Sequence, residues 1–280
     1  MLTLPDDPVR ERTDRPAIRP FRVAVKSIRR LSPSFLRVTF AGDELDVFGG
    51  AGLDQRIKLV LPLERPGAPR GFDHLGLDDP EMLAAGGWFE RWRQAPEDVR
   101  NPLRTYTVRS IRQDARELDV DFAVHGDGGP ASRWVRDARP GDELMVIGPD
   151  DRSTGYRLGI DWRPGECGEL LLVGDETAVP AACAILESLG PGVRATAFLE
   201  VPESGDVLDV ELAAPQHRIV WLPRDGAERG EQLVPRVRDW VQQNRSTVAP
   251  RPQASVTLDE SDVEAGLVWD APAEPEHAGF

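Results

Sequence analysis

Three short stretches of the chain carry the residues best suited to chemistry, and the first is Arg104-Thr105-Tyr106-Thr107. If this stretch is a strand, alternation puts Arg104 and Tyr106 on one face and the two threonines on the other. A guanidinium binds a phosphate with two parallel hydrogen bonds, and a phenol ring offers a flat surface for stacking. Tyrosine and threonine also favour strands on structural grounds alone. The stretch therefore fits a ligand but does not identify one.

The second stretch runs from His125 to Ser132 and is rich in glycine, with Pro130-Ala131 before the serine. It lies between a predicted strand and a predicted short helix, where free backbone N–H groups can hold a phosphate. Its glycines match part of the dinucleotide fingerprint, but that fingerprint requires a full crossover helix before the next parallel strand. The turn at residues 140–141 comes too soon for such a helix. A Rossmann site is therefore not assigned here, and a diphosphate-binding loop in a β barrel stays open.

The third stretch, residues 173–180, reads Val-Gly-Asp-Glu-Thr-Ala-Val-Pro and links a buried strand to a helix. In an α/β domain this position is the carboxyl edge of a parallel sheet, where ligands bind. Thr177 could simply cap the helix. That structural role accounts for the threonine but not for the whole segment, so Asp175 and Glu176 remain candidates for binding.

The other reactive side chains do not form a recognisable site. The histidines, His74, His125, His217 and His277, share no spacing typical of metal ligands, so we predict no metal site. A hydrolase is not expected, because no Gly-x-Ser-x-Gly segment surrounds Ser132. The two cysteines cannot form a CxxC pair or a disulfide framework, which fits a reducing, cytoplasmic compartment.

The charge of the chain limits its partners. With 48 acidic and 34 basic residues, the formal net charge is -14, which excludes non-specific coating of nucleic acid. No run of about 18 apolar residues is present, and the N-terminus lacks the apolar core of a secretory signal. We therefore expect no membrane insertion. Only Lys26 and Lys58 are lysines, which leaves arginine as the main anion ligand.

The first two stretches would have to be positioned by a β barrel. Residues 1–18 are rich in proline and charge and are predicted to be a flexible arm. Over residues 19–149, short runs of β-branched and aromatic residues recur between turn signals, as in a closed barrel. We predict an antiparallel six-stranded β-barrel, with strands at residues 21–28, 34–40, 55–61, 104–111, 118–125 and 144–147, and a helix at residues 81–94 that Gly86-Gly87 interrupts.

A change of pattern at residue 169 predicts a second domain, after a linker at residues 150–168 that is rich in glycine and proline. Residues 169–173 form a nearly continuous apolar run, typical of a strand buried on both faces. Strand, turn, helix and strand then follow in the order of a parallel α/β sheet. The predicted strands are residues 169–173, 193–201 and 218–222, and the helices are residues 178–189 and 232–242.

In this order the segments resemble the ferredoxin–NADP reductase superfamily and, more narrowly, the siderophore-interacting protein family of flavin-dependent ferric-siderophore reductases. The resemblance covers residues 18–270. Its segments are Asp54-Gln55-Arg56-Ile57-Lys58-Leu59, residues 104–109, residues 121–134 and residues 171–180. Members of the family usually continue with a further C-terminal segment, and the nucleotide domain of this chain, residues 169–280, is expected to lack it.

The resemblance implies that the barrel binds FAD and that the α/β domain binds NAD(P)H. By this likeness Arg104 contacts an FAD phosphate, Tyr106 packs against the isoalloxazine ring and Thr107 reaches the N5 region. The other residues implied in FAD binding are Val124, His125, Gly126, Pro130, Ala131 and Ser132 in the barrel, and Asp175, Glu176 and Thr177 in the second domain. Lys58 is a candidate contact for an anionic substrate. No catalytic residue is assigned, because outer-sphere electron transfer requires no protein acid or base.

The activity implied by the resemblance is the reduction of a ferric siderophore by NAD(P)H, in intracellular iron assimilation. Reduction would release the metal, because siderophore oxygens are hard ligands that suit Fe(III) better than Fe(II). Two alternatives stay open: a flavin reductase of the same superfamily with a different acceptor, and a non-catalytic siderophore-binding protein. We expect the protein to be a monomer.

Overall fold

The structure is a computed structural model, and it describes residues 11–63, 72, 76, 79–85, 87–124, 129–165 and 167–244. The chain divides into two compact units, one of Leu4–Asp161 and one of Trp162–Phe280 together with Met1–Thr3. Each unit has its own sheet. Of the helices in the described ranges, none combines the length and the apolar character needed to cross a bilayer.

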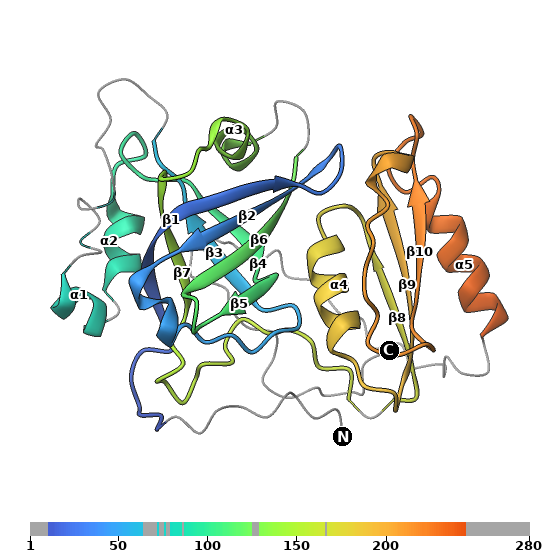
Figure 1. The fold of residues 1–280 in the computed structure, drawn as a ribbon, viewed down its shortest axis with the longest axis horizontal. Helices are drawn as coiled ribbons and strands as arrows, with labels where there is room; N and C mark the ends of the chain where they lie inside the picture. The colour runs from blue at the N-terminus through green and yellow to red at the C-terminus, as the bar shows by residue number, and fades with distance from the viewer. Residues whose placement is uncertain are drawn as a thin grey trace. The chain divides into compact units, whose positions relative to one another are not determined.

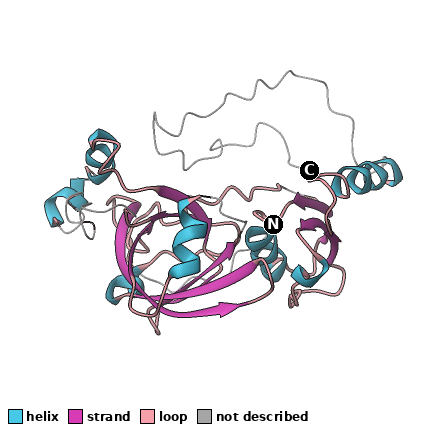
Figure 2. Cartoon of the chain, turned by 90° about the horizontal axis from the view of Figure 1, so that it is seen from above, coloured by secondary structure: helices cyan, strands magenta, loops and turns pink. Residues whose placement is uncertain are grey.

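The first unit is built on one antiparallel sheet of seven strands (Figure 1). These strands are β1 (Ile18–Arg30), β2 (Phe35–Ala41), β3 (Arg56–Val60), β4 (Leu103–Thr107), β5 (Ser110–Arg112), β6 (Glu117–Ala123) and β7 (Glu143–Pro149). Their order is β4-β3-β7-β1-β2-β6-β5, so β7 pairs with both β1 and β3. Figure 2 shows how strongly the sheet curls.

The sequence predicts six strands here, and the structure has seven because the predicted run at residues 104–111 is two strands, β4 and β5. The N–H of Val108 donates to the carbonyl of Gln55 beside β3, whereas the N–H of Arg109 donates to the carbonyl of Asp119 in β6. The chain changes partner between these two residues. Since β4 and β5 stand at opposite ends of the sheet order and only residues 108–109 separate them, the sheet must curl until its ends meet.

Phenylalanines fill the inside of the curled sheet. Phe21, Phe40 and Phe122 are completely buried. The helix α3 (Pro130–Asp137) packs its Trp134 over two of these rings, with centroids 6.2 Å from Phe40 and 6.0 Å from Phe122. Burial of apolar surface stabilises a core by roughly 25 cal/mol per Å², so these large rings account for much of the stability of the unit.

The remaining helical segments of the first unit are short. A 3-10 helix, η1 (Asp43–Val47), follows β2. The predicted helix at residues 81–94 is two helices, α1 (Pro80–Ala85) and α2 (Trp88–Gln94), and the break falls at the predicted glycine interruption. The N–H of Gly87 donates to the carbonyl of Met82, which ends the first helix.

Residues 150–161, which the sequence assigns to the linker, are hydrogen-bonded to the first unit. Phe48 and Asp150 form an isolated antiparallel bridge, and the N–H of Arg56 donates to the carbonyl of Gly159. From the predicted arm, Thr13 pairs with Ser153, while residues 1–10 lie outside the described ranges.

The second unit contains a parallel sheet of three strands, which confirms the predicted arrangement. The strands are β8 (Glu169–Gly174), β9 (Arg194–Val201) and β10 (Arg218–Pro223), in the order β10-β9-β8. The helices are α4 (Val179–Ser188), the short 3-10 helix η3 (Ser204–Asp206) and α5 (Leu233–Gln243). Figure 1 shows α4 and α5 on opposite faces of this sheet. Residues 245–280, the last part of the predicted nucleotide domain, lie outside the described ranges.

Candidate functional site

The first and second predicted stretches come together around Phe122 in the first unit. The Phe122 ring, on β6, lies 4.4 Å from the Tyr106 ring on β4 and 6.0 Å from the Trp134 ring on α3. Strand β4 carries the first stretch, and α3 begins with the last three residues of the second. The structure therefore places both stretches beside one buried ring.

Tyr106 faces the inside of the curled sheet, and Arg104 lies two residues earlier on the same face of β4. Burial raises the pKa of the Tyr106 phenol far above its ordinary value, and the nearby charge of Arg104 opposes this only in part. The phenol is therefore neutral at any physiological pH. Arg104 is exposed and donates to the carbonyl of Leu103 at 2.8 Å. A half-buried ring next to an exposed guanidinium suits a ligand with a flat ring system and a phosphate.

The other face of the same two strands carries Lys58, which stands opposite Thr105 in the register of β3 and β4. Its Nζ donates to Thr105 Oγ1 at 3.0 Å. The side chain is 7% exposed, and burial, followed by the charge of Arg56, lowers the pKa of the ammonium group. Little of Lys58 is thus open to a ligand. Thr107, at the end of β4, stands opposite Arg56.

The start of α3 offers backbone donors to a ligand. Its N-cap is Gly129, which has no side chain to cap the helix, and Pro130 at the first position has no N–H. The N–H groups of Ala131 and Ser132 have no acceptor within the helix. This described helix has no acidic residue in its first turn, and a Cβ placed on Gly129 would meet no described atom within 4 Å. Two N–H donors, a helix dipole and open space fit the charge of a diphosphate.

The remaining predicted residues of the second stretch are only partly described. Val124 is half-buried directly after β6, and its N–H donates to the carbonyl of Ser34 at 2.8 Å. His125 and Gly126 lie outside the described residues. Val124 therefore continues the pairing of β6 with β2 up to the point where the glycine-rich segment begins.

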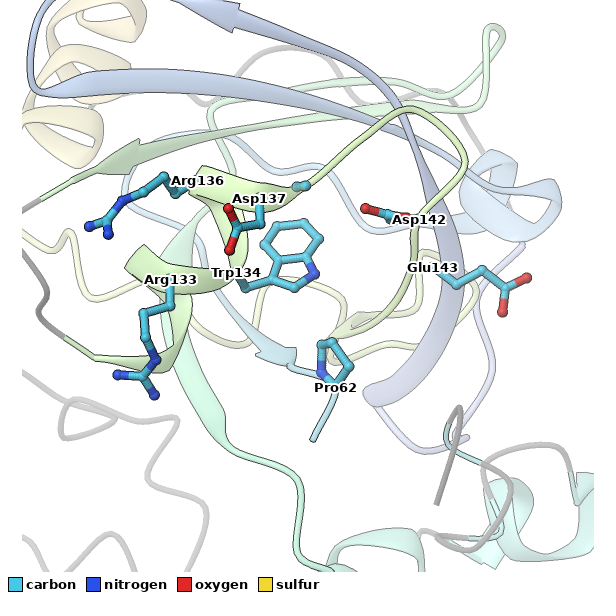
Figure 3. A pocket seen from close by; sticks show the side chains of 8 residues that line it. Pro62, Arg133, Trp134, Arg136, Asp137, Asp142 and Glu143 are labelled. Atoms are coloured by element: carbon cyan, nitrogen blue, oxygen red, sulfur yellow. The ribbon is translucent and has the colours of Figure 1, made fainter. Parts of the chain in front are cut away.

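A pocket of about 630 Å³ lies beside the second half of α3 (Figure 3). Figure 3 shows Trp134 reaching from the helix toward Pro62, while Arg133 and Arg136 extend away from that ring. None of the residues predicted to bind the cofactor lines this pocket. It therefore adds no support to the predicted site.

The third predicted stretch forms a tight turn between β8 and α4. The Asp175 carboxylate accepts hydrogen bonds from the Thr177 N–H at 2.9 Å and from the Thr177 hydroxyl at 2.6 Å. The N-cap of α4 is Ala178, so the alternative that Thr177 caps this helix is wrong. A Cβ on Gly174 would lie 2.4 Å from the Cβ of Ala178, so this turn requires glycine.

Glu176 is completely buried, and two arginines hold its carboxylate. Arg224 donates to its two oxygens at 2.7 and 3.0 Å, and Arg229 donates at 2.7 Å. Burial alone would raise the pKa of Glu176, but the hydrogen bonds and charges of the two arginines outweigh it and lower the pKa to about 2. The carboxylate thus fixes the segment after β10 to the turn after β8.

Sequence reasoning missed Arg224 and Arg229. Both arginines follow β10. The buried Glu200 of β9 accepts the N–H groups of Gly230 and Leu233, so it binds the same segment of the chain. The sequence did contain a signal, because the two arginines come just after a predicted parallel strand. The carboxyl ends of parallel strands lie at one edge of the sheet, so these arginines are at the same edge as the end of β8. Only the paired strands show which carboxylate they meet.

No metal site emerges in the described part of the chain. Within it, no three His, Cys, Asp or Glu side chains gather as ligands. His217 is buried, and its Nε2 lies 3.0 Å from the carbonyl oxygen of Leu189.

Both units match known family models. Residues 24–153 match the siderophore-interacting FAD-binding domain, and residues 168–263 match the siderophore-interacting protein model. Among solved structures, the siderophore-interacting protein SipS of Aeromonas hydrophila aligns with a TM-score of 0.57 and 30% identity, over 85% of this chain and 77% of that one.

Curated relatives carry names that state an activity. The ferric vibriobactin reductase ViuB of Vibrio cholerae is 32% identical over 196 residues, which are 70% of this chain and 63% of that protein. The NADPH-dependent ferric-chelate reductase of Escherichia coli is 34% identical over 190 residues, which are 68% of this chain and 63% of that protein. The matched part of the chain thus spans less than two thirds of the length of either relative.

Proposed function

Because the chain belongs to the siderophore-interacting protein family, we propose that it is an FAD- and NAD(P)H-dependent oxidoreductase that reduces a ferric siderophore. The names of the reductases from Vibrio cholerae and Escherichia coli support this activity. Reduction would release Fe(II) for iron assimilation, because the hard oxygen donors of siderophores bind Fe(II) much more weakly than Fe(III). We further propose that the protein works in the cytoplasm as a monomer.

The observation that carries this proposal is the start of α3. Gly129 and Pro130 leave the N–H groups of Ala131 and Ser132 without acceptors in the helix, beside open space. These donors fit the diphosphate of FAD, whose two negative charges the helix dipole favours. The small side chains of Ala131 and Ser132 would let the phosphates approach the backbone. Val124, His125 and Gly126 complete the proposed diphosphate site.

The residues of β4 fit the other parts of the same cofactor. Arg104 is exposed and would contact a phosphate with its guanidinium, and Tyr106 would pack against the flavin ring. Thr107, at the end of the strand, would reach the N5 region. Bound FAD would accept a hydride from NAD(P)H and deliver single electrons to the ferric complex.

The protein's own contribution is position and electrostatics. Electron transfer to iron needs no acid or base, and the raised pKa keeps the phenol of Tyr106 neutral beside the ring system. Lys58 remains a proposed contact for an anionic ferric complex, and it would have to move from its buried position beside Thr105.

In the second unit, we propose that the turn after β8 takes part in nucleotide and cofactor binding. Asp175 and Thr177 are bonded to one another at the carboxyl end of the strand, and Asp175 also lies 3.6 Å from the guanidinium of the exposed Arg229. Glu176 would act indirectly, because its bonds to Arg224 and Arg229 hold the turn in shape.

The experiment that tests this function starts with the absorbance spectrum of the purified protein. We expect a yellow protein, or one that becomes yellow with added FAD, whose absorbance near 450 nm bleaches with NADPH or NADH without oxygen. Adding a ferric siderophore should restore the absorbance and yield Fe(II), which ferrozine traps. A chain that binds no FAD would refute the proposal.

The same experiment separates the two alternatives. A flavin reductase with another acceptor would bleach with NAD(P)H but produce no Fe(II) from ferric siderophores. A non-catalytic siderophore-binding protein would bind the ferric complex without any bleaching. Competition between a ferric siderophore and free flavin as acceptors would rank the substrates.

A further inference from the structure

We propose that Arg109 is a positioning residue, whose ion pair with Asp121 holds the Tyr106 ring in the place where it packs against the flavin. The inference rests on the proposed function, because the contact between Tyr106 and the isoalloxazine ring is part of that proposal. Arg109 itself is not among the residues proposed to touch FAD. The contacts that carry the inference all lie within the first unit.

Arg109 lies where the chain crosses from one end of the curled sheet to the other. The N–H of Val108 donates to the carbonyl of Gln55 at 2.9 Å, beside β3. The N–H of Arg109 donates instead to the carbonyl of Asp119 in β6, also at 2.9 Å. Tyr106 comes three residues before Arg109 on β4, so the position of its ring depends on where this crossing is held.

The side chain of Arg109 makes a second contact with β6. Its Nε lies 3.5 Å from Oδ2 of Asp121, which comes two residues after Asp119 in that strand. The Asp121 side chain is 4% exposed and the Arg109 side chain 14% exposed. Arg109 therefore holds β6 at two points, one through its backbone and one through its guanidinium.

The ion pair and an aromatic pair lie on opposite faces of β6. Asp121 and Phe122 are neighbours in this strand, so their side chains point to opposite faces. On one face Asp121 meets Arg109, and on the other the Phe122 ring lies 4.4 Å from the Tyr106 ring. Both pairs therefore join the segment from Tyr106 to Arg109 to the same two residues of β6.

Side chains carry the contact at this place because the strands there are not neighbours in the sheet. Among the described strands, β4 pairs with β3, whereas β6 pairs with β2 and β5. No ladder of backbone hydrogen bonds thus fixes β4 against β6. The Arg109–Asp121 pair is one of the contacts that do so, and it lies next to the ring pair.

Asp121 is itself held in place, which makes it a suitable anchor. Its two carboxylate oxygens accept hydrogen bonds from Arg37 at 2.7 and 2.8 Å, and Arg37 stands directly opposite it in the register of β2 and β6. These bonds already give the carboxylate a charged partner within the paired strands. The Arg109 guanidinium adds a contact from the crossing, so it joins the crossing to a carboxylate that the sheet holds.

The test compares variants of Arg109 with a matched variant of Arg112, each studied as the full chain with FAD. Arg109→Met and Arg109→Gln remove the charge, and Arg109→Lys keeps it. The control is Arg112→Met, because Arg112 belongs to β5 and forms shorter ion pairs with β6, at 2.7 Å to Asp119 and 2.9 Å to Glu117. Tyr106→Leu provides the reference for complete loss of the ring.

The first readout is the fluorescence of bound FAD, measured with protein far above the Kd so that free FAD does not contribute. A tyrosine ring in contact with the isoalloxazine quenches this fluorescence by electron transfer. Arg109→Met and Arg109→Gln should therefore fluoresce more brightly than wild type and approach Tyr106→Leu. Arg109→Lys should lie near wild type, since its ammonium group can keep the ion pair. Arg112→Met should match wild type.

The second readout separates position from stability. The Kd for FAD should rise about fivefold in Arg109→Met, which is the effect of losing one well-placed aromatic contact. It should stay unchanged in Arg112→Met, although this variant should lower the melting temperature at least as much, because it loses the shorter ion pairs. A purely structural role of Arg109 would lower the melting temperature without this difference in FAD binding.

The outcomes distinguish the two proposals. A wild-type chain that binds no FAD would refute the proposed function, and this inference with it. If Tyr106→Leu increases the fluorescence but Arg109→Met and Arg109→Gln match wild type, only the inference is overturned. An equal increase in Arg112→Met and Arg109→Met would also overturn it, because the sheet would then be loosened in general. If Arg109→Met does not fold, Arg109→Gln decides, because it keeps a polar end on the side chain.

Discussion

At the scale of single residues, the firmest contacts outside the core are carboxylates held by arginine. The Asp121 carboxylate accepts two hydrogen bonds from the Arg37 guanidinium, at 2.7 and 2.8 Å. The Glu176 carboxylate accepts two from Arg224 in the same way. Bidentate pairs of this kind fix orientation as well as charge.

The pair at Glu176 leads to a prediction about stability and pH. Because the pKa of Glu176 falls from 4.5 to about 2 on folding, its charged form stabilises the protein above pH 4.5, and this contribution is lost as the pH falls toward 2. Glu176→Gln should therefore lower the free energy of unfolding by about 2–3 kcal/mol at pH 7, because Arg224 and Arg229 lose their shortest contacts with a buried carboxylate and keep only the longer ones to Glu200 and Asp175. The difference from wild type should shrink at pH 3. Urea titrations at both pH values measure it, and an equal difference at both would contradict the assignment.

The two lysines give a matched test of the proposed substrate contact. Lys58 is buried beside Thr105, whereas Lys26 is exposed and bonded to Glu117. If Lys58 contacts an anionic ferric complex, Lys58→Met should raise the KM for that complex about tenfold, which is the effect of losing one charge-assisted hydrogen bond. Lys26→Met should leave the KM unchanged. Steady-state rates with a ferric catecholate measure both, and equal KM values in the two variants would remove Lys58 from the site.

Sequence reasoning at this scale succeeded where the chemistry was local. It placed Arg104 and Tyr106 on one face of a strand, and the structure agrees. It could not tell that Asp175 binds both polar groups of Thr177, or that Glu176 meets Arg224, because the latter pair is 48 residues apart in the chain. Such pairings depend on which strands lie side by side.

At the scale of elements, the helix α3 is the main part of the proposed FAD site, and its N-cap residue can be tested by substitution. Gly129 has an extended backbone, with φ of -76° and ψ of 176°, which any residue can adopt. In Gly129→Asp, the new carboxylate would accept the N–H groups that the FAD diphosphate is proposed to use, and would also repel it. The Kd for FAD should rise at least about tenfold, while the melting temperature should not fall.

Gly129→Asn is the matched comparison for Gly129→Asp. Its amide oxygen caps the same N–H groups without a charge, so the two variants separate competition for donors from electrostatic repulsion. We expect an intermediate Kd, measured by fluorescence quenching of FAD. Unchanged FAD affinity in Gly129→Asp would mean that the diphosphate does not bind at α3.

Most elements could be predicted because their patterns are local. The alternation of apolar residues gives the strands of the first unit, and Gly86-Gly87 gives the break between α1 and α2. The division of residues 104–111 into β4 and β5 could not be predicted, since the alternation continues through it. The run is divided where the hydrogen-bond partner of the chain changes from Gln55 to Asp119, and this change depends on the curl of the whole sheet.

At the scale of the whole molecule, the division into two compact units predicts that the first unit folds alone. It has its own core of phenylalanines and ends at Asp161. A fragment of residues 1–161 should therefore show a cooperative thermal transition and bind FAD, but NADPH should not bleach its flavin, because the proposed nucleotide edge belongs to the second unit. Circular dichroism and anaerobic absorbance measure these properties. A fragment that NADPH reduces at the full rate would place nucleotide binding in the first unit.

The position of β7 also determines when the proposed flavin site can form during synthesis. Strand β7 is the last of the seven to leave the ribosome, yet it joins β3 and β4 to the other four strands. Before residues 143–149 emerge, the nascent chain can form only two separate pieces of sheet, and neither encloses the ring of Phe122 between Tyr106 and Trp134. Closure then requires contacts across more than a hundred residues, such as Arg22 with Glu143, and contacts this distant in sequence form slowly. If FAD binds at the proposed site, its binding is therefore expected to follow translation of the entire first unit.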